Sequence, residues 1–127
     1  MLQFEISASN KSPLYQQIID QAVEAILCGK WPPGEALPSI RALAVQMGLS
    51  VITVKRAYQE LERQNLIRTY PGKGSFVSGE IDLARESQLQ ALKAKMVDLM
   101  QLADLLGVSD EKLATLFYRV KQERTSS

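Results

Sequence analysis

Short polar and basic side chains at residues 50–56 are the groups best suited to bind a partner. Ser50 and Thr53 carry hydroxyls that can donate hydrogen bonds to phosphate oxygens, and Lys55 and Arg56 add two positive charges. If the segment is helical, the free backbone N–H groups at its start add a further favourable site for an anion. This combination predicts binding of a polyanion rather than bond-making chemistry.

The residue types needed for catalysis or metal binding are scarce. The chain of 127 residues has no histidine, which removes the commonest general base and the commonest metal ligand. Its one cysteine, Cys28, can form neither an intrachain disulfide nor a cysteine-rich zinc site. Because Cys28 follows Ile26 and Leu27, we expect a buried, inert thiol. We expect no enzyme, no metal and no cofactor.

The overall composition is that of an ordinary globular chain, with 46% hydrophobic and 23% charged residues. The length leaves room for one domain and a short extension. No apolar run reaches the roughly 18 residues that span a bilayer, and the first residues lack the order of a signal peptide. We expect a cytoplasmic protein without a membrane partner.

The net charge of +1 is distributed unevenly along the chain. Residues 1–38 carry a net −2 and residues 80–127 a net −1, whereas residues 39–79 hold six Lys or Arg against two Glu, a net +4. Such clustering is the electrostatic footprint of a polyanion-binding surface. The alternative is an exposed basic face on an ordinary helix.

Three helices are predicted before residue 66. In the first helix, Ser12 is the N-cap residue and Pro13 takes the first helical position. The helix ends before Gly29, and its apolar face consists of Leu14, Ile18, Ala22, Val23, Ile26 and Leu27. Phe4 and Ile6 weakly suggest a short strand ahead of it. The second helix starts at Ser39, runs to about Met47 and is ended by Gly48.

The third helix follows at once, with Ser50 as its cap and Asn65 as a left-handed stop. Two short helices joined by a tight turn with glycine predict a helix-turn-helix. The second helix of this motif enters the DNA major groove by its N-terminal residues. There Val51 and Ile52 could touch thymine methyl groups, while Lys55 and Arg56 reach phosphates or guanine.

A hairpin follows the helices, with strands at 66–70 and 75–78 around Pro71-Gly72-Lys73-Gly74. Its glycine-flanked lysine is too short a motif for a nucleotide-binding loop, so a wing that contacts DNA is favoured over a plain turn. We expect packing roles for the aromatic residues Trp31, Tyr58, Tyr70 and Phe76. The predicted DNA contacts are Ser39, Arg41, Ser50, Val51, Thr53, Lys55, Arg56, Gly72 and Lys73.

Residues 80–127 predict a dimerisation tail of two helices, separated at Gly107, with Ser109 as a cap. Apolar residues in the first helix are spaced 3, 4, 3, 4, 3, as in a coiled-coil seam. The predicted dimer contacts are Leu89, Leu92, Met96, Leu99, Ala103, Leu106, Leu113, Leu116, Phe117 and Val120. The alternative is a helical hairpin that caps the winged domain within a monomer.

Four segments together resemble the N-terminal domain of GntR-type transcriptional regulators: SPLYQQI at 12–18, GKWPPGEALPSIRALA at 29–44, TVKRAYQELE at 53–62 and GKGSFV at 72–77. A two-helix tail this short is similar to the YtrA subfamily, in which the tail mainly dimerises the protein. The resemblance implies DNA contacts from Arg41, from Ser50 through Lys55, and from Gly72 and Lys73. Many members have a polar run where this chain has Ser50-Val51-Ile52, so their base preference does not transfer.

The fold predicted is therefore mainly α (α+β): a winged helix-turn-helix over residues 1–79 with a two-helix dimerisation extension over residues 80–127. The function predicted is a homodimeric transcription regulator, a repressor, that binds an inverted-repeat operator in double-stranded DNA and sits on the nucleoid when bound. Relief by an unknown small-molecule effector, in a cleft between tail and winged domain, is a first alternative. A protein-interaction adaptor that does not bind DNA is the second.

Overall fold

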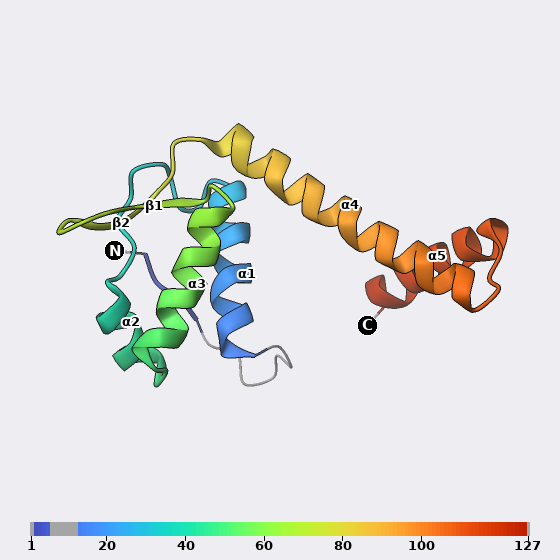
Figure 1. Ribbon diagram of the computed structural model, residues 1–127, viewed down its shortest axis with the longest axis horizontal. Coiled ribbons are helices and arrows are strands. Elements are labelled where there is room, and N and C mark those ends of the chain that lie inside the picture. The colour runs from blue at the N-terminus through green and yellow to red at the C-terminus, as the bar shows by residue number, and fades with distance from the viewer. Residues whose placement is uncertain (1, 6–12, 127) are drawn as a thin grey trace. The chain divides into compact units, whose positions relative to one another are not determined.

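A computed structural model gives the fold and describes residues 2–5 and 13–126. The chain divides into two compact units, Met1–Gln88 and Leu89–Ser127. The elements in chain order are α1 (Leu14–Leu27), α2 (Ile40–Met47), α3 (Val51–Arg63), β1 (Ile67–Tyr70), β2 (Gly74–Val77), α4 (Ile81–Leu105) and α5 (Asp110–Thr125) (Figure 1). This is the mainly α winged helix-turn-helix with two C-terminal helices that the sequence predicts.

Local capping explains where the helices begin and end. The Ser39 hydroxyl accepts a hydrogen bond from the Ala42 backbone N–H at 3.0 Å, and the Ser50 hydroxyl accepts one from Thr53 at 3.1 Å. Gly48, with φ 67°, ends α2 in the left-handed conformation that favours glycine. These caps confirm the predicted bounds of the helix-turn-helix.

The start of α1 differs from the prediction by one residue. The helix begins at Leu14, so Pro13 precedes it as the cap residue in an extended conformation with ψ 150°. The residue before the helix can be proline because no helical hydrogen bond requires its N–H. The predicted cap Ser12 lies outside the described residues.

The hydrophobic core of the first unit lies between α1, α2 and α3. Fully buried aliphatic side chains from all three helices meet there, together with Leu66 at the entry to the hairpin: Ile18, Ile26, Leu43, Val54 and Leu61. The buried face of α1 is wider than predicted, since it also includes Ile19, Ala25 and the polar Gln17. This core fixes α3 against its neighbours and leaves its outer side free.

The hairpin is tied to the helical core by a third segment. β1 and β2 pair antiparallel with Ile67 opposite Val77, and Ala36 forms an isolated bridge with Phe76. The Leu37 N–H donates to the Ser75 carbonyl at 2.9 Å, and the Val77 N–H donates to the Glu35 carbonyl at 2.8 Å. The loop ahead of α2 therefore holds the base of the wing.

Two local predictions are wrong. Residues 2–5 form no strand, because the backbone N–H and carbonyl of Glu5 bond to the side chain of Gln21 on α1; Ile6 lies outside the described residues. Cys28 is exposed, because it is the cap residue at the end of α1, after the last buried residue of the helix, Ile26. Tyr70 has the packing role predicted for it, since its ring centroid lies 6.0 Å from that of Phe76, although its place near the tip of the hairpin leaves it 49% exposed. Trp31 and Tyr58 are buried as predicted.

Side chains at the start of α4 belong to the first unit. Ala84 is buried, Arg85 donates to the Leu27 carbonyl at the end of α1, and Gln88 donates to Gln64. Asn65, in the left-handed conformation with φ 64°, donates to Ser87 at 3.4 Å. The first turns of α4 are thus fixed to α1 and to the end of α3.

The second unit consists of α4 from Leu89 onward and α5, which runs beside the end of α4 (Figure 1). The Ser109 hydroxyl caps α5, accepting from the Lys112 N–H at 3.2 Å. Among the described residues of this unit, Ala103 alone is buried. Leu113 and Leu116 are half-buried, and a groove of about 480 Å³ lies between them and Leu99.

Over residues 2–5 and 13–126, no helix is both long and apolar enough to cross a membrane. Within the same residues, His, Cys, Asp and Glu side chains form no group of three placed to hold a metal ion.

Tyr58 joins α3 to the loop ahead of α2, and its replacement is expected to destabilise the fold. Its buried hydroxyl donates to the Pro38 carbonyl at 2.7 Å, and burial raises the pKa of this phenol. Tyr58→Phe leaves that carbonyl without a donor and should lower the free energy of unfolding by about 1–2 kcal/mol, measured by urea denaturation. Tyr70→Phe, on an exposed tyrosine, is the matched control, and an equal effect of both changes would contradict this role.

Candidate nucleic-acid interface

The first turn of α3 presents both polar and apolar side chains to solvent. Ser50 is exposed and Thr53 half-buried, and their hydroxyls hydrogen-bond to one another at 2.8 Å. Val51 and Ile52 are 45% and 72% exposed. Lys55 and Arg56 follow on the next turn and are also exposed. The residues predicted to enter a DNA groove therefore lie on the solvent-accessible N-terminal turns of α3.

The second helix supports this surface. Ser39 and Arg41 are exposed at the start of α2, where the free backbone N–H groups give the helix its positive end. Buried Leu43, Ala44 and Met47 pack α2 on the core, and Tyr58 of α3 bonds to the carbonyl of Pro38 just ahead of it. The polar starts of α2 and α3 are therefore held in a fixed relation.

Ion pairing separates the basic residues of this region into two groups. Arg63 donates to Glu60 at 2.9 Å, and this hydrogen bond is the main reason that the pKa of the Glu60 carboxyl is lowered. Arg68 pairs with Glu80 at 2.8 Å. Both arginines are thus locally neutralised.

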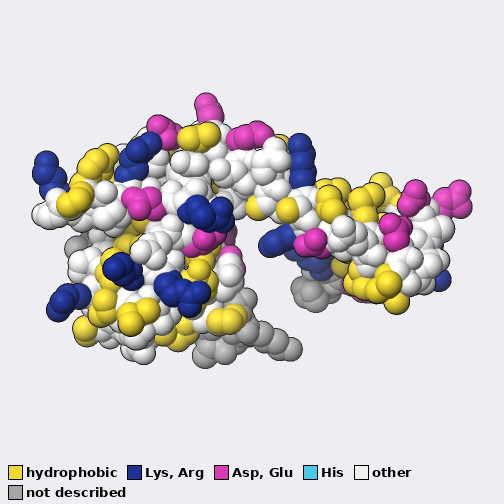
Figure 2. Space-filling view, in the orientation of Figure 1, with side chains coloured by type: hydrophobic (Ala, Val, Ile, Leu, Met, Phe, Trp, Pro, Cys, Tyr) yellow, Lys and Arg dark blue, Asp and Glu magenta, His cyan; other side chains and the backbone are white. Residues whose placement is uncertain are grey.

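The other four basic residues of the region have no such partner. Within the part of the chain that the structure describes, no ion pair is formed by Arg41, Lys55, Arg56 or Lys73. Figure 2 shows Lys and Arg side chains over α2, α3 and the hairpin tip. The predicted DNA contacts thus include all four basic residues of the region whose charge is not cancelled by a neighbouring acid.

Arg56 has a contact that the sequence analysis missed. Its guanidinium lies over the ring of Tyr15 on α1, 5.6 Å from the ring centroid. A cation over an aromatic face is held in place without losing its charge. Tyr15 thereby orients an arginine of α3 from a separate helix, and no local pattern in the sequence links the two residues.

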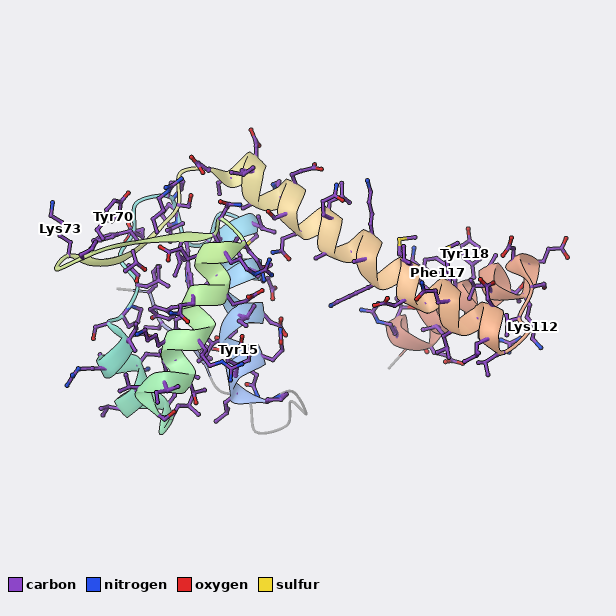
Figure 3. All side chains as sticks on the ribbon, in the orientation of Figure 1. Tyr15, Tyr70, Lys73, Lys112, Phe117 and Tyr118 are labelled. Carbon is purple, nitrogen blue, oxygen red and sulfur yellow. The ribbon has the colours of Figure 1, made fainter. Side chains whose placement is uncertain are left out.

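The wing ends in a tight turn that exposes Lys73. The Lys73 N–H donates to the Tyr70 carbonyl at 2.9 Å, and Gly72 has φ 76°, so the turn needs a residue that tolerates the left-handed region. Figure 3 shows Lys73 at the tip, pointing away from the strands. Within β1, the Thr69 N–H donates to Glu62 of α3 at 2.9 Å. The wing is therefore anchored to α3 and carries its charge at the free end.

The comparisons with known proteins agree with this arrangement. The model of the gntR family of bacterial regulatory proteins matches residues 14–77, from the start of α1 to the end of β2. The HTH-type transcriptional repressor YtrA of Bacillus subtilis (strain 168) is 36% identical over 110 residues, which cover 86% of this chain and 85% of that protein.

Solved structures match nearly the whole chain. A GntR family transcriptional regulator from Listeria monocytogenes has a TM-score of 0.67 at 25% identity, covering 87% of this chain and 97% of that one. YtrA from Sulfolobus acidocaldarius, a GntR-family transcription factor, has a TM-score of 0.55 at 30% identity, covering 94% and 97%. The winged unit, the exposed basic residues at the helix starts and the sequence match agree with one another. The chain therefore belongs to the gntR family of bacterial regulatory proteins, which are DNA-binding transcriptional regulators.

Proposed function

We propose that this chain is a homodimeric repressor that binds an inverted-repeat operator in double-stranded DNA. The observation that carries the proposal is the distribution of charge: basic residues without an ion pair stand at the starts of α2 and α3 and at the wing tip, whereas Arg63 and Arg68 are paired. A surface that keeps its positive charge unpaired attracts the phosphate backbone.

In this proposal α3 enters the major groove by its first turns. Ser50, Thr53 and the N-terminal amides of α3 face phosphate, and Lys55 and Arg56 contact phosphate or guanine. Ser39 and Arg41 at the start of α2 contact the backbone beside the groove. Gly72 allows the wing to approach closely, and Lys73 reaches a phosphate or the minor groove.

The apolar surface of the second unit supports a dimer. Seven of the ten residues predicted in the interface are 44–68% exposed in the single chain: Leu89, Leu92, Met96, Leu99, Leu106, Phe117 and Val120. Apolar exposure extends beyond that stripe to Val97, Met100, Leu102 and Leu105. Contiguous apolar surface of this kind marks a contact with another protein. A second copy of this unit, with the same surface, would cover it around a two-fold axis.

Dimerisation also suits the proposed binding. Two winged units related by a two-fold axis read two half-sites about 34 Å apart, or a multiple of that spacing. The two parts of the chain then have separate roles: residues 1–79 bind DNA, and residues 80–127 hold the two copies together. Repression is proposed because the Bacillus subtilis relative is named a transcriptional repressor. Relief by a small ligand stays a prediction.

The salt dependence of binding tests this function against the adaptor alternative. Four unpaired basic residues per protomer give eight in a dimer, so log Kd should rise with log salt concentration at a slope of about 7. Fluorescence anisotropy on a duplex selected for binding, at several salt concentrations, measures the slope. Micromolar or weaker affinity for every duplex, indifferent to salt, would leave the adaptor as the better description.

A further inference from the structure

The most exposed part of α3's first turn is apolar, and packing does not explain it. Val51 and Ile52 lie outside the hydrophobic core and outside the half-buried residues that pack against it. Ile52 keeps 72% of its surface exposed, on a helix whose other aliphatic residues, Val54 and Leu61, are fully buried. Two β-branched side chains stand where a helix entering a groove meets the base edges.

The polar side chains of the same turn, Ser50 and Thr53, bond partly to one another. The Ser50 hydroxyl accepts from the Thr53 N–H and shares a hydrogen bond with the Thr53 hydroxyl. One of the two hydroxyl protons is thus used within the turn and the other remains for phosphate, while the apolar outward contacts of this turn are made by the methyl groups of Val51 and Ile52. Lys55 and Arg56, one turn later, supply the charge that draws a nucleic acid onto the same side of the helix.

The major groove offers an aliphatic side chain one apolar partner, the 5-methyl group of thymine. Against cytosine, guanine or adenine the same side chain would cover a donor or acceptor without bonding to it, which disfavours those bases. We propose that Val51 and Ile52 read thymine methyl groups, so that each operator half-site carries at least one thymine facing the start of α3. This inference rests on the proposed function and specifies which bases the site selects.

The experiment replaces thymine by uracil, which removes only the methyl group. Duplexes are first selected from a random pool with the full chain, and uracil is then placed at each thymine of a half-site in turn. At one or two positions the affinity should fall about fourfold per methyl, equivalent to about 0.8 kcal/mol. In Ile52→Ala or Val51→Ala the same replacement should cost less than twofold at the position that residue reads.

Two controls separate this effect from a general loss of binding. Ile52→Val keeps branched methyl groups and should retain most of the uracil effect. Leu83→Ala, on a 48% exposed leucine of α4, should retain all of it. Uracil without effect at every thymine, or with equal effect in the wild type and both alanine variants, would overturn the inference and leave the proposed function standing. Failure to enrich any duplex would overturn both.

Discussion

Arg41→Ala and Lys73→Ala should each weaken operator binding about 10- to 100-fold without unfolding the protein. Neither side chain forms an ion pair in the described part of the chain, so both charges are available to phosphate. Each change removes one charge-assisted contact of roughly 1 kcal/mol from both protomers, and the effects add in the dimer. The slope of log Kd against log salt should also fall by about two.

The matched control is Arg63→Ala. Arg63 lies on α3 as well, but it is paired with Glu60, so its loss should leave affinity and salt slope unchanged. Thermal unfolding followed by circular dichroism checks that all three variants remain folded. If Arg41→Ala or Lys73→Ala binds as tightly as the wild type, that residue does not contact DNA. An equal loss in Arg63→Ala would mean that net charge alone governs binding.

Leu99→Asp should convert the dimer to a monomer. Leu99 is 52% exposed in the single chain and lies at the edge of the groove lined by α5, so a carboxylate there would be buried without a partner in the dimer. Light scattering should then give the mass of one chain, 14.1 kDa. Operator affinity should fall by at least 100-fold, because the second half-site is no longer linked to the first.

Ala94→Asp provides the comparison for this change. Ala94 is exposed on α4 and occupies the position of the predicted heptad farthest from the seam, so the same carboxylate there should remain in solvent. The variant should keep the mass of the wild type. A dimeric Leu99→Asp protein would refute the seam. A monomeric mass for the wild-type protein would instead favour a helical hairpin that caps the winged domain within a monomer.

Elements fixed by local chemistry could be predicted from the sequence. Ser39, Ser50 and Ser109 cap their helices as expected, because a hydroxyl that accepts from the N–H three residues later needs only its own turn. Gly48 and Asn65 adopt the left-handed conformation that was expected of them. The order of elements followed from these signals, whereas the family was indicated by the resemblance of four sequence segments.

Features that depend on tertiary contacts could not be predicted in the same way. The pairing of Arg68 with Glu80 joins residues on either side of the hairpin, and Tyr15 meets Arg56 from another helix. The bridge from Ala36 to Phe76 has no counterpart in local periodicity. The exposure of Cys28 and Tyr70 depends on how far the core extends, which apolar neighbours in the chain do not reveal. Only the fold separates the four unpaired basic residues from the two that are neutralised.

Selection of duplexes from a random pool by the full chain, followed by sequencing, tests the central claim most directly. A dimer of winged units should enrich an inverted repeat whose half-sites are centred about 10 base pairs apart, or a multiple of that distance. The double variant that combines Arg41→Ala and Lys73→Ala should no longer enrich the DNA sequences that the wild-type protein selects. A pool that remains random after repeated rounds at moderate salt would contradict the account.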